Sequence, residues 1–316
     1  MTLPRQFRRL RIALVGVGDV AKRTLSQRLV YESSRHGPRF ILASRTGRSA
    51  LSNTQQSGLS RNRGAVLALD LDNPASADRL VRSSQAMIIY VPTSEMPTRI
   101  AGRDKRARVL ANAIRKSGQR PPLVYLSTTG VYGNHAGGVV TEVSRCHPTQ
   151  ARSQRRLDAE RVLRPLGGHI LRVPGIYAHD RLPTARIQSR QPALATTDDV
   201  FTNHIHADDL ARIAWLALFR GRPTRVTNAV DDTELKTADY FDVVADALGL
   251  SRPPRISAHD MRELGKTGAV NPMMMSFLSE SRRVHSERLG RELRVQLTFP
   301  TVQDALNDLT RRTSSR

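Results

Sequence analysis

Residues 11–21 read Arg11-Ile12-Ala13-Leu14-Val15-Gly16-Val17-Gly18-Asp19-Val20-Ala21, an apolar run followed by two glycines and the start of a helical pattern. This order predicts a buried strand, a tight turn and a helix, and the turn has the form G-x-G-x-x-A. Gly16 permits the sharp reversal, Gly18 lets a pyrophosphate approach the backbone, and Ala21 allows close packing of the helix on the strand. Because the N-terminus of a helix attracts phosphate, the segment indicates a dinucleotide site that includes Asp19 and Val20. The alternative is a tight turn with no ligand.

The next apolar run, residues 40–43, ends in Ser44 and Arg45, with Arg48 close behind. Folds that prefer NAD usually place Asp or Glu here, where it accepts hydrogen bonds from the ribose 2′-hydroxyl. A carboxylate would repel a 2′-phosphate, whereas a guanidinium can bind it with two parallel hydrogen bonds. Ser44 and Arg45 therefore favour NADP as the cofactor, with NAD as the second choice. The alternative is that Arg45 is one more surface arginine.

Composition indicates a globular protein, because 39% of the 316 residues are hydrophobic and 25% are charged. No apolar run approaches the roughly 18 residues that a membrane-spanning helix needs. The basic start, residues 1–10, precedes a run that suits a first strand better than an export signal. The single cysteine, Cys146, cannot form an internal disulfide, which fits a reducing compartment. We therefore expect a cytoplasmic protein with no membrane partner, either a monomer or a homodimer.

The charge is strongly positive, with 50 Lys and Arg against 28 Asp and Glu and a net value of +22. Such a balance ordinarily suggests a nucleic-acid partner. Here only five of the basic residues are lysines, and the arginines are spread along the whole chain rather than gathered in one block. Aromatic residues, on which unpaired bases stack, make up only 4%. We expect a small-molecule substrate and no specific nucleic-acid partner.

After the glycine turn, apolar runs at 66–69, 86–91, 123–126 and 170–173 alternate with segments of helical spacing at 99–116 and 154–163. This alternation predicts an α/β fold, a Rossmann-like doubly wound parallel sheet that binds ligands at the carboxyl ends of its strands. We expect a basic arm over 1–10 and a dinucleotide-binding domain over 11–175. A mainly substrate-binding portion over 176–310 adds some sheet elements, and a frayed tail covers 311–316.

The expected cofactor contacts are the residues at the carboxyl ends of these strands, because ligands bind there in parallel sheets. They are Asp70, Leu71, Val91, Pro92, Ser127 and Val173. The histidines show none of the spacings typical of metal ligands, so we expect no metal site.

Three further segments occur in a characteristic order: Leu126-Ser127-Thr128-Thr129-Gly130-Val131-Tyr132-Gly133, then residues 171–177 (LRVPGIY), then residues 203–211 (NHIHADDLA). Together with the glycine turn, they make residues 11–306 resemble the extended short-chain dehydrogenase/reductases of the NAD-dependent epimerase/dehydratase superfamily. The resemblance implies a Rossmann fold, a nicotinamide dinucleotide and an oxidoreductase or epimerase-like activity on a carbonyl or hydroxyl substrate. It also implies that Thr128 hydrogen-bonds the reacting oxygen.

The resemblance is incomplete at the position of a Tyr-x-x-x-Lys pair, in which the tyrosine transfers the proton. Here the lysine position is Arg156 and the tyrosine position is Arg152. A guanidinium stays protonated and cannot act as an ordinary proton shuttle, although Arg156 can still bond a ribose hydroxyl. The chain therefore resembles the atypical branch of the superfamily, which keeps the cofactor fold and alters the catalytic pair.

A substitute proton donor would have to come from a segment expected at the same edge of the sheet. Tyr132, His135 and Tyr177 meet this condition, although each could instead pack in the interior or lie on a polar loop. Among the nearby polar residues, Asp208 is expected to cap the helix that contains residues 210–218.

Two departures argue against a nucleotide-sugar substrate. Thr129-Gly130 stands where the nucleotide-sugar dehydratases place Asp-Glu, and Thr202 stands where epimerases often carry an arginine for the diphosphate. Two interpretations of function stay open. The first is an NAD(P)-dependent oxidoreductase or epimerase-like enzyme, and the second is a catalytically degenerate NADP-binding regulatory or interaction protein.

Overall fold

The computed structural model describes residues 10–31, 37–47, 64–94 and 101–314. At its centre lies a seven-stranded sheet with the strand order β12-β7-β5-β4-β1-β2-β3, in which every neighbouring pair runs parallel. The strands are β1 (Arg11–Val15), β2 (Arg39–Ser44), β3 (Ala65–Ala68), β4 (Ala86–Ile89), β5 (Leu123–Thr128), β7 (His169–Val173) and β12 (Val226–Asn228). The order reverses between β1 and β4, which confirms the predicted Rossmann-like α/β class.

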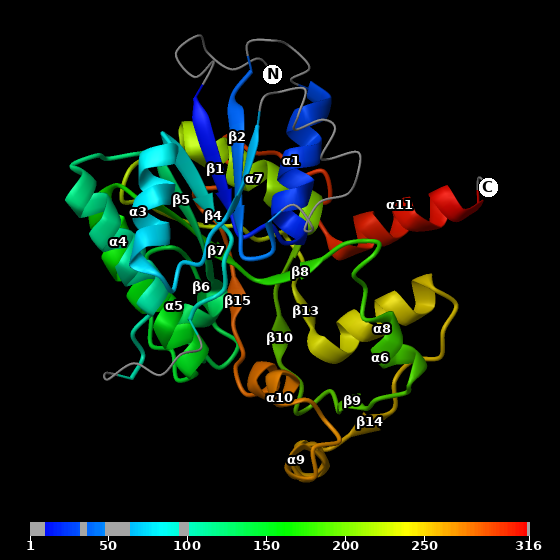
Figure 1. Cartoon of the computed structure of the whole chain (residues 1–316). Coiled ribbons are helices and arrows are strands. Elements are labelled where there is room, and N and C mark those ends of the chain that lie inside the picture. The colour runs from blue at the N-terminus through cyan, green and yellow to red at the C-terminus, as the bar shows by residue number, and fades with distance from the viewer. Residues whose placement is uncertain (1–9, 32–36, 48–63, 95–100, 315–316) are drawn as a thin grey trace.

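Helices cover both faces of this sheet (Figure 1). One face carries α1 (Asp19–Tyr31) and α7 (Ala207–Arg220), and the other carries α3 (Pro74–Ser83), α4 (Lys105–Ser117) and α5 (Ala151–Leu163). Residues of β1 alternate between the two cores, because Ile12 and Leu14 pack with the α1 side and Ala13 and Val15 with the opposite side. Burial on both sides explains why the strand reads as a continuous apolar run.

Helix boundaries depend on caps that the apolar spacing did not reveal. The helix expected from residue 99 begins at Lys105, where the carboxylate of Asp104 accepts a hydrogen bond from the N–H of Ala107 (2.6 Å). The helix expected from residue 154 begins at Ala151. The expectation that Asp208 caps α7 is wrong, because the cap is His206, whose Nδ1 accepts from the N–H of Asp208 (3.2 Å).

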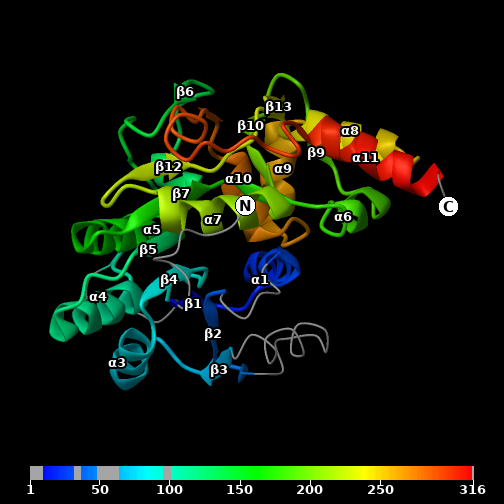
Figure 2. The same cartoon turned by 90° about the horizontal axis from the view of Figure 1, so that it is seen from above.

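Smaller elements gather at one end of the central sheet, and the view from above shows them beside its edge (Figure 2). The chain returns from this region through α7 and β12, so the sheet takes elements from beyond residue 175. Helix α11 (Val302–Ser314) continues past Arg311, where the tail was expected to fray. Within the described residues, no helix combines the length and the apolar character needed to cross a bilayer. The remaining elements are η3 (Thr129–Tyr132), β6 (Val139–Val140), η4 (Arg164–Leu166), β8 (Gly175–Tyr177), α6 (Thr184–Gln188), β9 (Ala193–Leu194), β10 (Phe201–Thr202), β11 (His204–His206), β13 (Leu235–Lys236), α8 (Thr237–Ala247), β14 (Arg255–Ile256), α9 (Ala258–Lys266), α10 (Pro272–Leu278) and β15 (Arg283–Val284).

Candidate active site

The two glycines of the first turn, Gly16 and Gly18, differ in whether the surrounding protein requires a glycine at that position. Gly16 has a φ of +89°, and a Cβ there would lie 2.8 Å from Cγ1 and 2.9 Å from the backbone nitrogen of Val91. At Gly18, a Cβ would meet none of the described protein atoms within 4 Å. A glycine is thus required at position 16, both by the positive φ and by the close approach of Val91, which follows β4. Packing against the described residues does not require a glycine at position 18, where the backbone borders open space.

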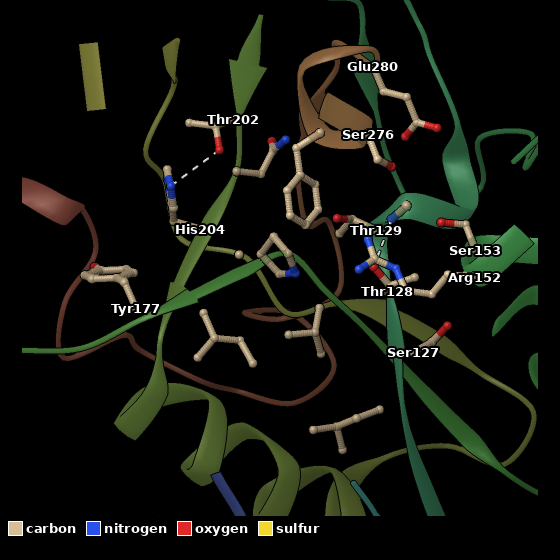
Figure 3. Close-up of a pocket in the computed structure, with 18 of the residues that line it drawn as sticks. Ser127, Thr128, Thr129, Arg152, Ser153, Tyr177, Thr202, His204, Ser276 and Glu280 are labelled. Carbon is tan, nitrogen blue, oxygen red and sulfur yellow. Dashed lines mark hydrogen bonds between the residues drawn. The ribbon is translucent and has the colours of Figure 1, made fainter. Parts of the chain in front are cut away.

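That open space belongs to a cavity of about 610 Å³ at the carboxyl ends of the central strands (Figure 3). Its volume lies in the range of small-molecule sites. Its wall combines the start of α1, the ends of β5 and β7, the start of α5, and parts of α10. The predicted site residues on this wall are Gly18, Asp19, Val20, Ala21, Ser127, Thr128, Arg156 and Val173.

The other predicted cofactor contacts lie off the wall. Leu71, Val91 and Pro92 border a second, much smaller cleft beside Arg106. Arg45 is exposed in the turn after β2, and Arg48 lies outside the described residues. The full set off the wall of the main cavity is Gly16, Ser44, Arg45, Asp70, Leu71, Val91, Pro92 and Tyr132.

Two adjacent hydroxyl groups at the end of β5 differ in what they can offer a ligand. The hydroxyl of Ser127 donates to Oε1 of Glu160 (2.6 Å), so its proton is engaged inside the protein. The Oγ1 of Thr128 accepts a hydrogen bond from the N–H of Gly130 (3.2 Å). An oxygen that accepts from the backbone keeps its own O–H proton for another acceptor. Thr128 is therefore suited to donate to a ligand oxygen in the cavity.

None of the three candidate proton donors combines a place on the wall with a free hydroxyl or imidazole. Tyr132 is fully buried, its hydroxyl donates to Oδ1 of Asn228 (2.7 Å), and burial raises its pKa to about 12. Tyr177 lies on the wall across from Thr128 (Figure 3), but its hydroxyl donates to the carbonyl of Thr301 (3.3 Å) and burial raises its pKa. His135 packs against His147 with ring centroids 4.6 Å apart, away from the wall. Tyr132 and His135 therefore lie outside the wall of this cavity.

The two arginines at the positions of the missing Tyr-Lys pair both line the cavity. The Nη1 of Arg156 donates to the carbonyls of Val91 (3.1 Å) and Leu126 (2.9 Å) and to the hydroxyl of Tyr125 (2.8 Å). These bonds fix Arg156 at the ends of β4 and β5. The guanidinium of Arg152 instead lies over the ring of Phe277, 5.2 Å from its centroid.

Several wall residues come from distant segments and were not among the predicted site residues. Arg181 donates to Oδ2 of Asp19 (2.8 Å), and this bond together with those from Arg23 outweighs burial and lowers the pKa of Asp19. Arg282 forms an ion pair with Glu280 (2.8 Å) just after α10. His204 is buried, which lowers its pKa to about 3 and keeps its ring neutral.

Comparison with solved structures finds chains that match nearly the whole length of this one. A conserved protein of unknown function from Silicibacter pomeroyi shares 25% identity, with a TM-score of 0.75 over 96% of this chain and 99% of that chain. A dTDP-glucose 4,6-dehydratase from Streptomyces venezuelae with NAD bound shares 16% identity, with a TM-score of 0.72 over 97% and 98%. A UDP-glucuronic acid 4-epimerase from Bacillus cereus in complex with NAD shares 14%, with a TM-score of 0.69 over 96% and 99%.

No family model and no curated protein sequence matches this chain. The order of the motifs, the seven parallel strands and the solved structures nevertheless agree on one architecture. The chain has the fold of the NAD-dependent epimerase/dehydratase superfamily of short-chain dehydrogenase/reductases.

Proposed function

We propose that this chain binds a nicotinamide dinucleotide and acts as an oxidoreductase or epimerase-like enzyme on a small carbonyl or hydroxyl substrate. One observation carries the proposal: a single cavity joins the open backbone at Gly18 to the hydroxyl of Thr128. The dehydratase and the epimerase of the same fold hold NAD, which supports the choice of cofactor. The bound dinucleotide would supply a nicotinamide ring that accepts or donates a hydride.

The wall residues that would bind the cofactor and those that would contact the reacting group lie at two ends of the cavity. At one end, the first turn of α1 offers N–H groups that have no partner within the helix, and Gly18 leaves room for a pyrophosphate beside them. At the other end, Thr128 donates a hydrogen bond to the oxygen of the reacting group. Arg156, held by Val91 and Leu126, lies at the sheet edge between them and can meet a ribose hydroxyl.

A second function is favoured by the residue at the tyrosine position. Arg152 cannot exchange a proton as a tyrosine does, because a guanidinium stays charged. Tyr177, the tyrosine opposite Thr128, has its hydroxyl bound to Thr301. A protein that binds NADP for regulation or for contact with a partner, with little chemistry of its own, would also have this site.

Cofactor binding is tested by replacing Gly18 with valine. The side chain would occupy the space beside the first turn of α1, so we expect Gly18→Val to abolish binding of both NADP(H) and NAD(H) in calorimetric titrations. Gly290→Val is the matched control, because Gly290 is exposed, off the cavity wall, and also free of described atoms within 4 Å of a Cβ. Unchanged affinity in Gly18→Val would mean that the turn is purely structural.

Chemistry is tested separately at Thr128. Removing one donor to a developing oxyanion typically lowers the rate by about 10²–10³, so we expect a loss of this size in Thr128→Ala. The measurement is single-turnover oxidation of NADPH with a panel of small carbonyl compounds. Thr128→Ser keeps both the O–H and the acceptor for Gly130, so we expect it to retain most of the rate. Cofactor binding without hydride transfer, or full activity in Thr128→Ala, would favour the second function.

A further inference from the structure

The charge on the cavity wall is not balanced. Its charged side chains are Asp19, Arg152, Arg156, Arg181, Glu280 and Arg282. Arg181 pairs with Asp19 and Arg282 pairs with Glu280, each at 2.8 Å. Within the described parts of the chain, Arg152 and Arg156 form no ion pair with a carboxylate. The wall therefore carries two arginines that form no ion pair with a described carboxylate.

The two unpaired arginines differ in how their donors are used. Arg156 gives hydrogen bonds to two backbone carbonyls and one hydroxyl. For Arg152, the contact with Phe277 holds the guanidinium in place but supplies no oxygen acceptor. Among the described residues, none accepts a hydrogen bond from Arg152, although a guanidinium has five N–H donors. Arg152 is thus a fixed cation whose hydrogen-bonding capacity faces a cavity.

The position of Arg152 is electrostatically unfavourable as long as nothing compensates it. Arg152 and Arg156 are spaced i and i+4 on α5, and like charges at this spacing destabilise a helix. Arg152 also lies in the first turn of α5, which contains no acidic residue, and a cation there opposes the helix dipole. Burial and the charge of Arg156 lower the pKa of Arg152, and Glu280, already paired with Arg282, opposes this only in part. An anion beside Arg152 would offset these unfavourable interactions.

The location of this cation determines which part of a ligand it would meet. Figure 3 shows Arg152 on the same side of the cavity as Thr128 and Thr129, across from Thr202, His204 and Tyr177. The turn at Gly18, where a pyrophosphate would bind, belongs to another part of the wall, at the start of α1. An anion held by Arg152 would therefore lie beside the group that Thr128 contacts.

We propose that Arg152 binds the anionic group, a carboxylate or a phosphate, of a small substrate whose carbonyl or hydroxyl oxygen meets Thr128. The contact to Thr128 rests on the proposed function, whereas recognition of the anion by Arg152 does not. The substrate class is thus an oxo or hydroxy acid, or a phosphorylated carbonyl compound. Arg152 is then a binding residue that selects negatively charged substrates. It stands at the position where related enzymes carry the tyrosine that transfers a proton.

The test uses matched pairs of probes that differ in charge. Wild-type protein saturated with NADP⁺ is titrated by calorimetry, at constant ionic strength, with pyruvate and acetone and with dihydroxyacetone phosphate and dihydroxyacetone. The oxidised cofactor has no hydride to donate, so the carbonyl groups of the probes are not reduced during the titration. We expect an anionic probe to bind at least about tenfold more tightly than its neutral partner. The pair that shows the larger difference distinguishes a carboxylate site from a phosphate site.

Variants then assign the effect to Arg152. We expect Arg152→Gln to lower the affinity for the anionic probe about 10- to 100-fold, because hydrogen bonds to charged groups have this magnitude. The affinity for the neutral probe should not change. Arg152→Lys keeps the charge without the planar fork, so we expect an intermediate affinity. Arg161→Gln removes an exposed arginine from the same helix, off the cavity wall, and should behave as wild type. Circular dichroism and urea unfolding establish that each variant is folded.

Several results would overturn the anion site: no binding of any probe, equal affinity within both pairs, or equal losses in Arg152→Gln and Arg161→Gln. Repeating the titrations without dinucleotide separates this proposal from the proposed function. If no dinucleotide binds but Arg152→Gln still lowers the affinity for the anionic probe, the anion site stands and the proposed function fails. If NADP⁺ binds and Gly18→Val abolishes that binding while Arg152→Gln changes nothing, only the anion site fails.

Discussion

At the end of β2, the side chain of Arg45 is exposed and makes no ion pair with any described carboxylate. It follows Ser44, at the point where an acidic residue would select the 2′-hydroxyl of NAD. Because no described residue accepts a hydrogen bond from this guanidinium, we expect it to be available for a 2′-phosphate.

We expect Arg45→Ala to weaken NADP(H) binding by about 1.5–3 kcal/mol, the range for hydrogen bonds to a charged group, and to leave NAD(H) binding unchanged. Calorimetric titration with each cofactor gives the two affinities. Arg39→Ala, which removes an exposed arginine from the start of the same strand, is the control. Equal affinity of the wild type for both cofactors would show that Arg45 is a surface arginine only.

At this scale, the sequence predicted backbone roles better than side-chain roles. Gly16 and Gly18 were identifiable because a turn between a strand and a helix depends on a few adjacent residues. For Tyr132 the sequence left a proton donor and an interior residue as alternatives, because the direction of its hydroxyl depends on Asn228, which belongs to a strand far along the chain. A motif fixes where a residue lies in the chain, but a long-range contact decides which way its side chain points.

At the scale of elements, helix α5 is tied to the sheet by one buried carboxylate. Glu160 accepts from the hydroxyl of Ser127 on β5 (2.6 Å) and pairs with Arg172 on β7 (2.8 Å). Glu160 is only 1% exposed and Arg172 only 4% exposed, so neither charge can be screened by water. The network positions the helix that presents Arg152 and Arg156 to the cavity.

Glu160→Gln should lower the free energy of unfolding by about 3–5 kcal/mol, because it leaves the buried guanidinium of Arg172 without a counter-charge. Urea unfolding measures this loss. The control is Glu263→Gln, which breaks an exposed pair with Lys266 and should cost no more than about 1 kcal/mol. We also expect Glu160→Gln combined with Arg172→Met to be more stable than Glu160→Gln alone. Similar losses in Glu160→Gln and Glu263→Gln would contradict this account.

Element type was more predictable than element boundaries. The strands of the central sheet could be located because burial on both faces makes them continuous apolar runs. The start of α4 follows from the side chain of Asp104, and that of α7 from the imidazole of His206. Such caps act through one hydrogen bond, so apolar spacing does not reveal them.

For the whole molecule, the sequence predicted the parallel sheet and the edge at which ligands bind, but it did not predict the shape of the cavity. Its wall joins Arg152, His204 and Phe277, which come from three separate segments of the chain. Their meeting depends on how the small elements after β7 pack against the sheet, and periodicity within a segment carries no information on such packing.

Asp231 belongs to the junction between the central sheet and these later elements. It follows β12, its N–H donates to the carbonyl of His204 (2.9 Å), and the N–H of the next residue, Asp232, donates to the carbonyl of Pro300 (2.8 Å). Its Oδ1 accepts from the N–H of Thr233 (3.1 Å), whereas Oδ2 has no described hydrogen-bond partner. Burial is the largest influence on this carboxyl and raises its pKa to about 7.

This pKa predicts how stability depends on pH. An unfolded aspartate titrates near 3.9, so between about pH 4 and pH 7 the unfolded state is ionised while the folded state still holds the proton. Because the folded state binds more protons in this window, the contribution of Asp231 to stability is fully present below about pH 4 and is lost as the pH rises to about 7.

We therefore expect the free energy of unfolding of the wild type to fall, relative to that of Asp231→Asn, by up to about 4 kcal/mol between pH 4 and pH 7. The asparagine keeps an acceptor for Thr233 but cannot ionise, so subtracting its pH profile removes the titration of all other groups. Urea unfolding at a series of pH values gives both profiles. Asp232→Asn removes the charge of the exposed neighbour, which has only a small influence on the pKa of Asp231, and should stay close to the wild-type profile. A difference between the wild type and Asp231→Asn that stays constant with pH would mean that Asp231 is ionised in the folded protein throughout this range. The junction would then hold a buried charge.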